Sequence, residues 1–374
     1  MPDPSLSVPE LWEQIIGFVP TSSKCADLKA VALVCRSFTP PAQRGIFHTV
    51  SFVTGNRWLN GRQHDELAES ARRFADIVES SPHLLSYVYH LRLHNAGPGC
   101  YHALAAIPWS HLRQLYVQYP LPPKAKADLT RLIGLPSLRE LDIRTWGDHP
   151  IDILSLCSTS IEKLSIAPEY QSHPPEAPPR PSLRPKILEL KLNGTTPFIG
   201  YVTELFDLTS LKTLEWWGTP CPDLDRFFLE YGQTVETLNL SDLSTWAAWD
   251  DFSLSHFPSV TSIRTLSKIT KRHNKILDTL PLDNHVLHLS FYAERRTLNE
   301  EIQDIARDLE EIVLTRLMAV RSVEFTTRSD EFASEAMRSL FPTQRSLVDR
   351  HRELFPRLWE RKLLSVYVED LKLE

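Results

Sequence analysis

The sequence is short of several features that mark common classes of protein. Only 12 of its 374 residues are glycine, against 28 prolines, which indicates stiff, irregular connections between elements. Its five cysteines are odd in number and form no CxxC pair, so we expect reduced thiols, buried as small apolar groups, rather than a disulfide framework. The net charge of −6 argues against a nucleic-acid-binding protein, which would carry a basic stripe.

Signals for membrane insertion or secretion are also missing. No apolar run approaches the ~18 residues of a membrane-spanning helix. The opening Met1-Pro2-Asp3-Pro4 lacks the basic region of a signal peptide. We therefore expect a cytoplasmic or nuclear protein without a membrane partner.

The motifs of common catalytic sites do not occur. There is no Gly-x-Gly-x-x-Gly, no phosphate-binding loop and no Gly-x-Ser-x-Gly. His285 and His288 lie three residues apart on a predicted strand, so they face opposite ways and make a poor metal pair. His90 and His94 share a face, but Arg92 between them disfavours a cation. The sequence thus predicts no enzyme activity, no metal site and no cofactor.

What the sequence does contain is a repeated pattern of an apolar residue, two variable positions, leucine or isoleucine, one variable position and usually a further apolar residue. Successive central residues are 23 to 26 positions apart; they are Leu91, Leu115, Leu141, Leu164, Leu190, Leu214, Leu238 and Ile263. A constant period in this range is typical of stacked repeats, because one unit cannot bury its apolar side alone. The alternation within each copy predicts a strand with one buried face. The remaining residues suffice for a crossover, which would make successive strands parallel.

This pattern resembles the leucine-rich repeat, over residues 84–292. The resemblance implies an α/β solenoid with parallel strands on its concave face and helices or irregular crossovers on its convex face. The stacked leucines would each contribute roughly 1.5–3 kcal/mol by burial. The repeats are divergent, because the family's closing Asn or Cys is replaced in this sequence by Ala96, Pro120, Trp146, Glu169 and Thr195.

Beyond residue 263 the pattern loosens. Leu287 continues it at a step of 24, and strands centred on Val323 and Val366 follow longer insertions. The insertion over 298–312 carries apolar residues at 4-3-4-3 spacing, which predicts a helix on the outer wall or, alternatively, a coiled-coil surface. Residues 293–374 are therefore expected to form irregular repeats and helices. Seven prolines in 168–185 predict an exposed loop, serving either as a plain linker or as a docking segment.

Residues 1–50 follow a different pattern. Pro9 suits the first turn of a helix that carries Leu11, Trp12, Ile15, Ile16 and Val19. A second helix is expected from Asp27, with Leu28, Val31, Cys35 and Phe38 on one stripe. A short third helix would end at Ile46-Phe47, and residues 51–83 would form a helical linker or cap. Three such helices have too little interior to be stable alone, so they must cap the array or dock on another protein.

The segment Val8-Pro9-Glu10-Leu11-Trp12, with Val34-Cys35-Arg36-Ser37-Phe38 after it, resembles an F-box. It is most similar to the F-box-like segments that precede irregular leucine-rich arrays in fungi. The family's Leu-Pro opening aligns here with Ser7-Val8. The resemblance implies docking on the small linker subunit of a cullin-RING (SCF-type) ubiquitin ligase, through Pro9, Leu11, Ile15, Ile16, Leu28, Val34, Cys35 and Phe38. The repeats would then hold a substrate protein.

The outward positions of the predicted strands form a polar surface of mixed charge on the concave face. Tyr, Trp and Arg contribute most to interface energies, so we expect substrate-binding residues among them and their charged neighbours. The candidates are Arg92, Tyr116, Asp142, Arg144, Lys191, Glu215 and Trp217, and the row ends with Ser262 and Arg264. Trp216, next to Trp217, is expected to point inward. Two alternatives remain at this stage: a solvated face that binds nothing, and a protein-binding scaffold whose helical segment is only a structural cap without a ubiquitin role.

Overall fold

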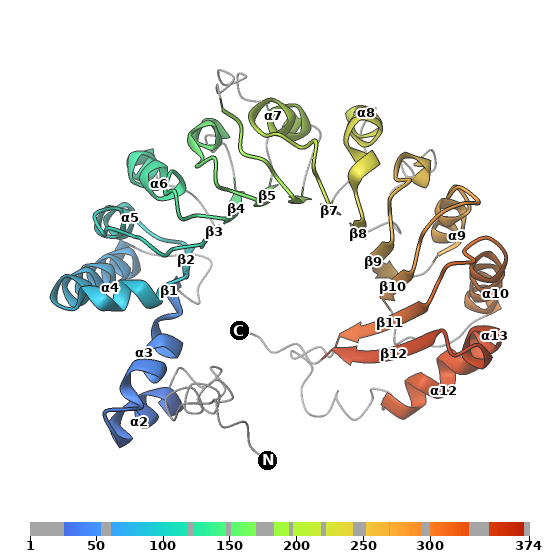
Figure 1. Ribbon diagram of the computed structural model, residues 1–374, viewed down its shortest axis with the longest axis horizontal. Coiled ribbons are helices and arrows are strands. Elements are labelled where there is room, and N and C mark those ends of the chain that lie inside the picture. The colour runs from blue at the N-terminus through green and yellow to red at the C-terminus, as the bar shows by residue number, and fades with distance from the viewer. Residues whose placement is uncertain are drawn as a thin grey trace, which may run out of the picture. The chain divides into compact units, whose positions relative to one another are not determined.

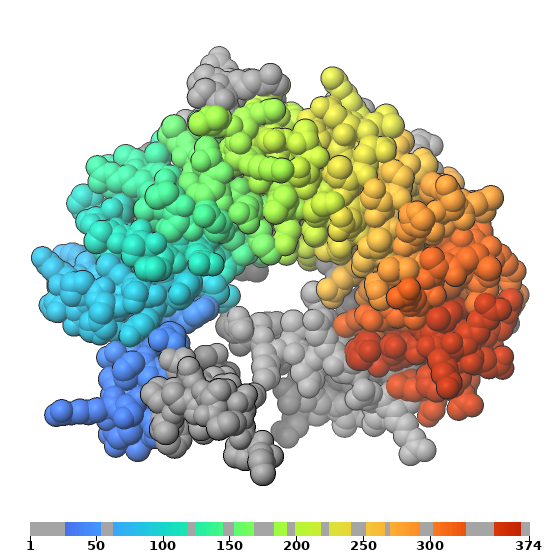
Figure 2. Space-filling view, viewed as in Figure 1, coloured from blue at the N-terminus to red at the C-terminus, as the bar shows by residue number. Residues whose placement is uncertain are grey.

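The computed structural model describes residues 26–53, 61–118, 123–146, 151–169, 183–193, 197–217, 222–241, 252–268, 270–292, 300–328 and 344–369. It divides into two compact units, which we call unit 1 (residues 1–185) and unit 2 (residues 186–374). Both are α/β structures built from parallel strands, as in a repeat solenoid (Figure 1). In the space-filling view, neighbouring repeats of each unit adjoin without a break (Figure 2).

Unit 1 begins with a pair of helices and continues as five strands with helical crossovers. Its elements are α2 (Ala26–Val34), α3 (Thr39–Phe47), β1 (Thr49–Val53), α4 (Gly61–Ser80), the 3₁₀ helix η1 (Pro82–Tyr87), β2 (His90–His94), α5 (Pro98–Ala105), β3 (Gln114–Gln118), η2 (Pro123–Ala125), α6 (Lys126–Ile133), β4 (Glu140–Trp146), η3 (Ile151–Leu156) and β5 (Lys163–Glu169).

Unit 2 contributes seven strands with longer crossovers toward its end. Its elements are β6 (Glu189–Asn193), α7 (Pro197–Leu205), β7 (Thr213–Trp217), α8 (Pro222–Tyr231), η4 (Gly232–Thr234), β8 (Thr237–Ser241), η6 (Leu254–His256), β9 (Ser262–Lys268), α9 (Lys271–Leu277), β10 (His288–Tyr292), α10 (Glu300–Thr315), β11 (Ser322–Arg328), α12 (Gln344–Leu354), α13 (Pro356–Glu360) and β12 (Leu364–Glu369).

The predicted leucine stack is present in both units. Within each unit the strands follow one another in chain order and all pair in parallel. The central residues face each other across the strands and are buried; they are Leu91, Leu115, Leu141 and Leu164 in unit 1, and Leu190, Leu214, Leu238, Ile263, Leu289, Val323 and Leu364 in unit 2. Burial of this one side chain per repeat joins each strand to the next.

Two central positions near the end of the chain were predicted wrongly. Leu289, not Leu287, lies opposite Ile263, so the copy is Val286-x-x-Leu289-x-Phe291. Likewise Leu364, not Val366, lies opposite Val323. Each error is a slip of two residues, which leaves the same side chains on the buried face and therefore does not show in the alternation.

The sheet of unit 1 also begins earlier than the expected bound at residue 84. Strand β1 pairs with β2 in register, with Val50 opposite Leu91 and Phe52 opposite Leu93. This first strand lies where the F-box-like segment was expected to join a helical linker. The rest of that linker contains α4, whose Phe74 stacks on Trp109 at 6.1 Å between ring centroids.

The apolar stripe predicted over 298–312 forms α10. Ile305 and Leu309 are buried, while Leu298 lies outside the described residues. The helix contacts α9, α12 and α13 of its own unit. It is therefore part of the outer helical layer, and a coiled-coil surface is not needed to explain its pattern.

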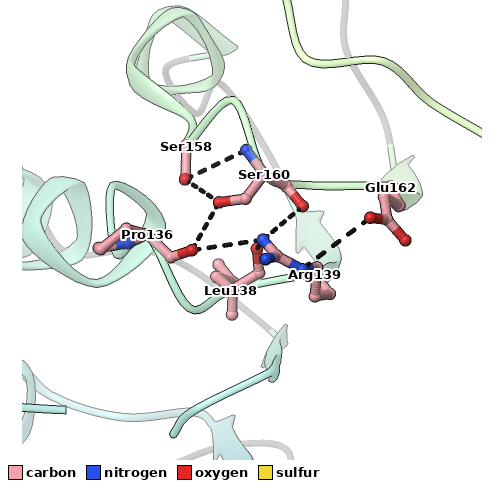
Figure 3. Close-up of polar contacts among 6 residues, drawn as sticks. All are labelled: Pro136, Leu138, Arg139, Ser158, Ser160 and Glu162. Carbon is pink, nitrogen blue, oxygen red and sulfur yellow. Dashed lines mark hydrogen bonds and ion pairs between the residues drawn. The ribbon is translucent and has the colours of Figure 1, made fainter. Parts of the chain in front are cut away.

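Polar groups link successive repeats at the turns that precede the strands. In unit 1, Ser160 Oγ donates to Pro136 O of the previous repeat at 2.8 Å, and Arg139 Nη1 donates to Ser160 O at 3.1 Å (Figure 3). In unit 2, Ser259 Oγ donates to Gln233 O at 2.7 Å in the same way. Each hydroxyl stands just before the first apolar residue of the pattern. These bonds satisfy backbone carbonyls that the turns would otherwise leave unpaired.

The segment over residues 1–50, which was predicted to resemble an F-box, is described only from residue 26 onward. There α2 ends at Val34, so the expected stripe from Leu28 to Phe38 is not one continuous helix. Pro40 and Pro41 occupy the first turn of α3 rather than merely stopping the helix before it. Helix α2 packs on α3, and α3 packs on η1 and β1. In Figure 2 the pair, in blue, protrudes from the repeats of unit 1.

The proline-rich stretch 168–185 lies largely outside the described residues. At its start, however, Pro168 belongs to β5 and lies opposite Thr145 of β4. Residues 168 and 169 therefore belong to a strand and not to the expected loop.

Candidate functional site

The helices that connect the strands of each unit lie on one side of these strands (Figure 1). We call the opposite side of the strands the open face. Along β2, β3 and β7, buried and half-buried residues alternate without exception, which places the variable positions of the pattern on this face. The open face is thus the surface on which the seven predicted substrate-binding residues lie.

In unit 1 the predicted residues form a row across three strands. Arg92 lies opposite Tyr116, and Tyr116 lies opposite Asp142. Arg144 donates to both carboxylate oxygens of Asp142, at 3.3 Å from Nε and 3.2 Å from Nη2, and its guanidinium lies 5.4 Å from the centroid of the Tyr116 ring. Tyr116 Oη donates to Gln118 Oε1. The charges of Asp142 and Arg144 are therefore neutralised within the protein.

In unit 2 the predicted residues form a second self-contained cluster. Lys191 Nζ lies 3.3 Å from Glu215 Oε2 on the neighbouring strand, and Trp217 Nε1 donates to Glu215 Oε1 at 2.5 Å. Asn239 Nδ2 donates to Glu215 Oε2 at 3.5 Å. Trp216 is buried, as its inward orientation requires. The indole of Trp217 is half-buried and held in place by Glu215, so this cluster presents a fixed aromatic surface.

The open face of unit 2 also contains a hollow that the sequence analysis did not predict. A hollow of about 590 Å³ lies over β8 to β12; it is lined by Thr237, Asn239, Ser262, Arg264, His288, Leu289, Ser290, Glu324, Thr326 and Tyr367. Ser262 and Arg264 stand on the row of outward positions read from the sequence, but nothing in that row distinguished them. The outward residues of β10 to β12 were missed because the row of outward positions read from the sequence ended at Arg264.

The charged residues of the hollow differ from those of the two clusters. Arg264 of β9 and Glu324 of β11 are both half-buried, and in the described part of the chain neither has a hydrogen-bond or ion-pair partner. Ser290 of β10 lies opposite both of them. His288 Nδ1 is 2.8 Å from Ser322 Oγ on the next strand. The hollow therefore offers one cation and one anion without internal neutralisation.

Burial shifts the pKa of several histidine and cysteine side chains of unit 1. No group of three or more metal-ligating side chains occurs within the described ranges. Burial lowers the pKa of both His90 and His94, and the neighbouring His48 and Arg92 lower that of His90 further. Burial also raises the pKa of the Cys100 thiol to about 12, which keeps it protonated at neutral pH. Of the helices that the structure describes, none combines the length and the apolar character needed to cross a bilayer.

The residues predicted to dock on a linker subunit divide into three groups. Pro9, Leu11, Ile15 and Ile16 lie outside the described residues. Leu28 is only 2% exposed and packs against Gly45 of α3, so it belongs to the interior of the helix pair and not to its surface. Val34 and Cys35 are exposed, and Phe38 is half-buried.

The end of α2 forms an exposed apolar patch that the sequence identified only in part. Leu33 is 87% exposed and Val34 is 70% exposed, and Cys35 follows them on the surface. Leu33 was missed because it lies off the stripe that joins Leu28, Val31 and Cys35. We call Leu33, Val34 and Cys35 the α2 patch. These adjacent side chains give the end of α2 an exposed apolar surface.

Comparisons with known proteins leave the family open. No protein-family model matches the sequence, and no curated protein matches it. Among solved structures, the chain is similar to the crystal structure of the Rad7 and Elc1 complex in yeast, with 12% sequence identity and a TM-score of 0.37 over 91% of this chain and 92% of that chain. A likeness of this degree carries no argument about partners or activity.

Proposed function

We propose that the protein is a substrate-recognition adaptor of a cullin-RING ubiquitin ligase of the SCF type. Its F-box-like segment docks on the linker subunit, and the open faces of its repeats bind a substrate protein. It acts by binding, in the cytoplasm or nucleus, and performs no chemistry of its own. The observation that carries this proposal is the exposure of Leu33 and Val34 in the α2 patch.

The α2 patch stands within the most specific part of the F-box resemblance, Val34-Cys35-Arg36-Ser37-Phe38. A few apolar side chains that lose water on binding dominate helix-in-groove recognition. Leu33 and Val34 are available for such a contact because both are exposed, and α2 is held in place by its packing on α3. The buried Leu28 supports the patch by fixing α2 on α3.

The adaptor role requires a second surface for the substrate, and the open faces supply it. Their predicted residues Tyr116 and Trp217 are aromatic and held by neighbouring polar groups. Aromatic side chains with few rotatable bonds lose little entropy when a partner covers them. We assign substrate contact to these two residues and to their charged neighbours Arg92, Asp142, Arg144, Lys191 and Glu215.

Linker docking is tested by replacing the exposed apolar side chains of the α2 patch. The double variant Leu33→Asp, Val34→Asp should lose at least tenfold in affinity for the purified linker subunit, because two carboxylates would be buried in an apolar groove. The measurement is isothermal titration of the full chain. Both side chains are exposed in the free protein, so its unfolding midpoint should not change.

A matched control uses exposed apolar residues of unit 2. Leu282 is 76% exposed and Met318 is 79% exposed. The variant Leu282→Asp, Met318→Asp should bind the linker subunit as the unmodified chain does. Undiminished binding by the folded α2-patch variant would exclude linker docking through α2.

One observation favours the alternative of a repeat scaffold without a ubiquitin role. Helix α3 packs on η1 and β1, and Arg44 of α3 lies 5.6 Å from the centroid of the Tyr87 ring in η1. These contacts are what a structural cap would make. In that case deletion of residues 1–38 should leave substrate binding intact, and no linker subunit should bind either form.

A further inference from the structure

We propose that the hollow on the open face of unit 2 binds a segment of a partner protein that carries one acidic and one basic side chain. Arg264 would hold the acidic side chain and Glu324 the basic one. The proposal deepens the proposed function, because it names the chemistry of the substrate segment, and it rests on the repeats binding a protein partner.

The first argument is the state of the two charges. Arg264 and Glu324 are half-buried, yet neither has a partner among the described residues. Partial removal of a charge from water is unfavourable unless an opposite charge or hydrogen bonds compensate for it. By contrast, Lys191 and Glu215 on the same face of the same unit compensate each other at 3.3 Å. A partner that supplies the missing charges would remove this cost at Arg264 and Glu324.

The second argument is the spacing of the two charges. Arg264 lies opposite Ser290, and Ser290 lies opposite Glu324, so one strand separates them. Two strand spacings of about 4.8 Å place their backbones about 10 Å apart. Ser290 is too short to bridge them. A segment that crosses the strands in polyproline II conformation advances about 3.1 Å per residue and brings every third side chain to the same face, so its two charged residues would stand about three positions apart.

The third argument is the chemistry around the pair. Ser262, Thr326 and Asn239 provide neutral hydrogen-bonding groups, and Tyr367, 51% exposed, provides an aromatic surface at the rim. Such groups suit a peptide backbone. A nucleic acid is disfavoured, because the carboxylate of Glu324 would face its phosphates. A purely apolar segment is disfavoured because it would bury both charges without partners.

The probe for this proposal is a displayed library of random eight-residue peptides, selected against the full chain. Enriched peptides should carry an acidic and a basic residue about three positions apart. A synthetic copy of the most enriched peptide should bind at least tenfold more weakly to Arg264→Ala and to Glu324→Ala when measured by fluorescence anisotropy. The exchanged variant Arg264→Glu, Glu324→Arg should reject this peptide and bind its counterpart with the two charged residues exchanged.

The control removes a pair that is already neutralised. The variant Asp304→Ala, Arg307→Ala removes an ion pair on α10 whose two residues lie 3.2 Å apart and do not line the hollow. It should bind the peptide with unchanged affinity, and thermal unfolding monitored by circular dichroism should show that each variant is folded. The proposal is overturned if no peptide is enriched, if enriched peptides lack the acid–base pair, or if the alanine variants bind as tightly as the original chain.

Failure here is distinguishable from failure of linker docking. All the variants of the hollow retain the α2 patch, so they should bind the linker subunit normally. Conversely, Leu33→Asp, Val34→Asp should leave peptide binding unchanged. Each measurement therefore tests one surface.

Discussion

Two regions of the open faces, the Asp142–Arg144 cluster of unit 1 and the hollow of unit 2, are built on the same repeat but differ in whether their charges are neutralised. In unit 1, Asp142 and Arg144 pair within one strand and hold Tyr116 beside them. In the hollow of unit 2, Arg264 and Glu324 stand two strands apart with a serine between them. The comparison teaches that a polar repeat face is not uniformly available to partners. Where the protein neutralises its own charges, a ligand gains little; where it does not, a ligand gains most.

The largest loss of stability should come from truncating the leucine stack, which both units share. Leu141→Ala in unit 1 and Leu214→Ala in unit 2 each delete a fully buried side chain of the leucine stack. Each should lower the free energy of unfolding by about 2–5 kcal/mol through lost burial and the cavity left behind. Urea unfolding followed by circular dichroism measures the change. The exposed Leu33→Ala is the control and should cost less than about 0.5 kcal/mol; equal losses at all three positions would refute the burial argument.

The second-largest effect should be a loss of stability in unit 2 as the pH falls. In unit 2, His273 is buried at the start of α9, its Nδ1 accepts the N–H of Thr270 at 3.0 Å, and burial lowers its pKa to about 4. Unfolded histidine titrates near 6.5, so between about pH 6.5 and pH 4 only the unfolded chain gains a proton. Stability is therefore fully present above about pH 6.5 and falls as the pH drops toward 4, by on the order of 3 kcal/mol.

Hydrogen exchange of α9 measured by mass spectrometry across this pH range tests the expectation for His273. After correction for the intrinsic pH dependence of exchange, α9 should lose protection as the pH falls. The variant His273→Gln should remove most of this loss, because glutamine does not titrate. A loss of the same size in the variant would assign it to other groups.

The smallest effects are the changes in stability on removing one carboxylate from each open face, and these two changes should differ in sign. Asp142→Ala breaks the ion pair with the partly exposed Arg144 and should destabilise the protein by about 0.2–1 kcal/mol. Glu324→Gln removes a charge that has no partner among the described residues, so stability should stay the same or rise by a few tenths of a kcal/mol. Midpoints of chemical unfolding, measured at low salt for both variants, distinguish the two changes in stability. A loss at Glu324 as large as at Asp142 would indicate that Glu324 is neutralised within the protein after all.

The buried face of the strands could be predicted from the sequence, whereas their register could not. Alternation assigned Leu115, Leu190 and Trp216 to the interior, and the structure confirms all three. It failed at Leu289 and Leu364, because neighbouring apolar residues two positions away satisfy the same alternation. Only the backbone pairing with the preceding strand, set by the length of each crossover, selects between them.

The helix pair shows a similar division. The stripe at 3-4-3 spacing located α2, but Leu28, predicted to dock on a partner, is buried against α3. Cys35, expected to be packed inside, lies on the surface. The reason is that α2 ends at Val34. Helical spacing no longer determines which side a residue faces once the helix has ended. The exposed Leu33 then becomes part of the patch that the sequence pattern had left out.

By itself the sequence determined that this protein is a stack of parallel strands with leucines inside, because a period-two pattern repeated every two dozen residues can bury its apolar side in no other way. It also determined which residues reach the open faces. Only the tertiary structure decided which charges on those faces are neutralised. That depends on contacts across strands, as between Lys191 and Glu215, and on the serine that keeps Arg264 from Glu324. Such distances are fixed by strand spacing and register, which no single strand encodes.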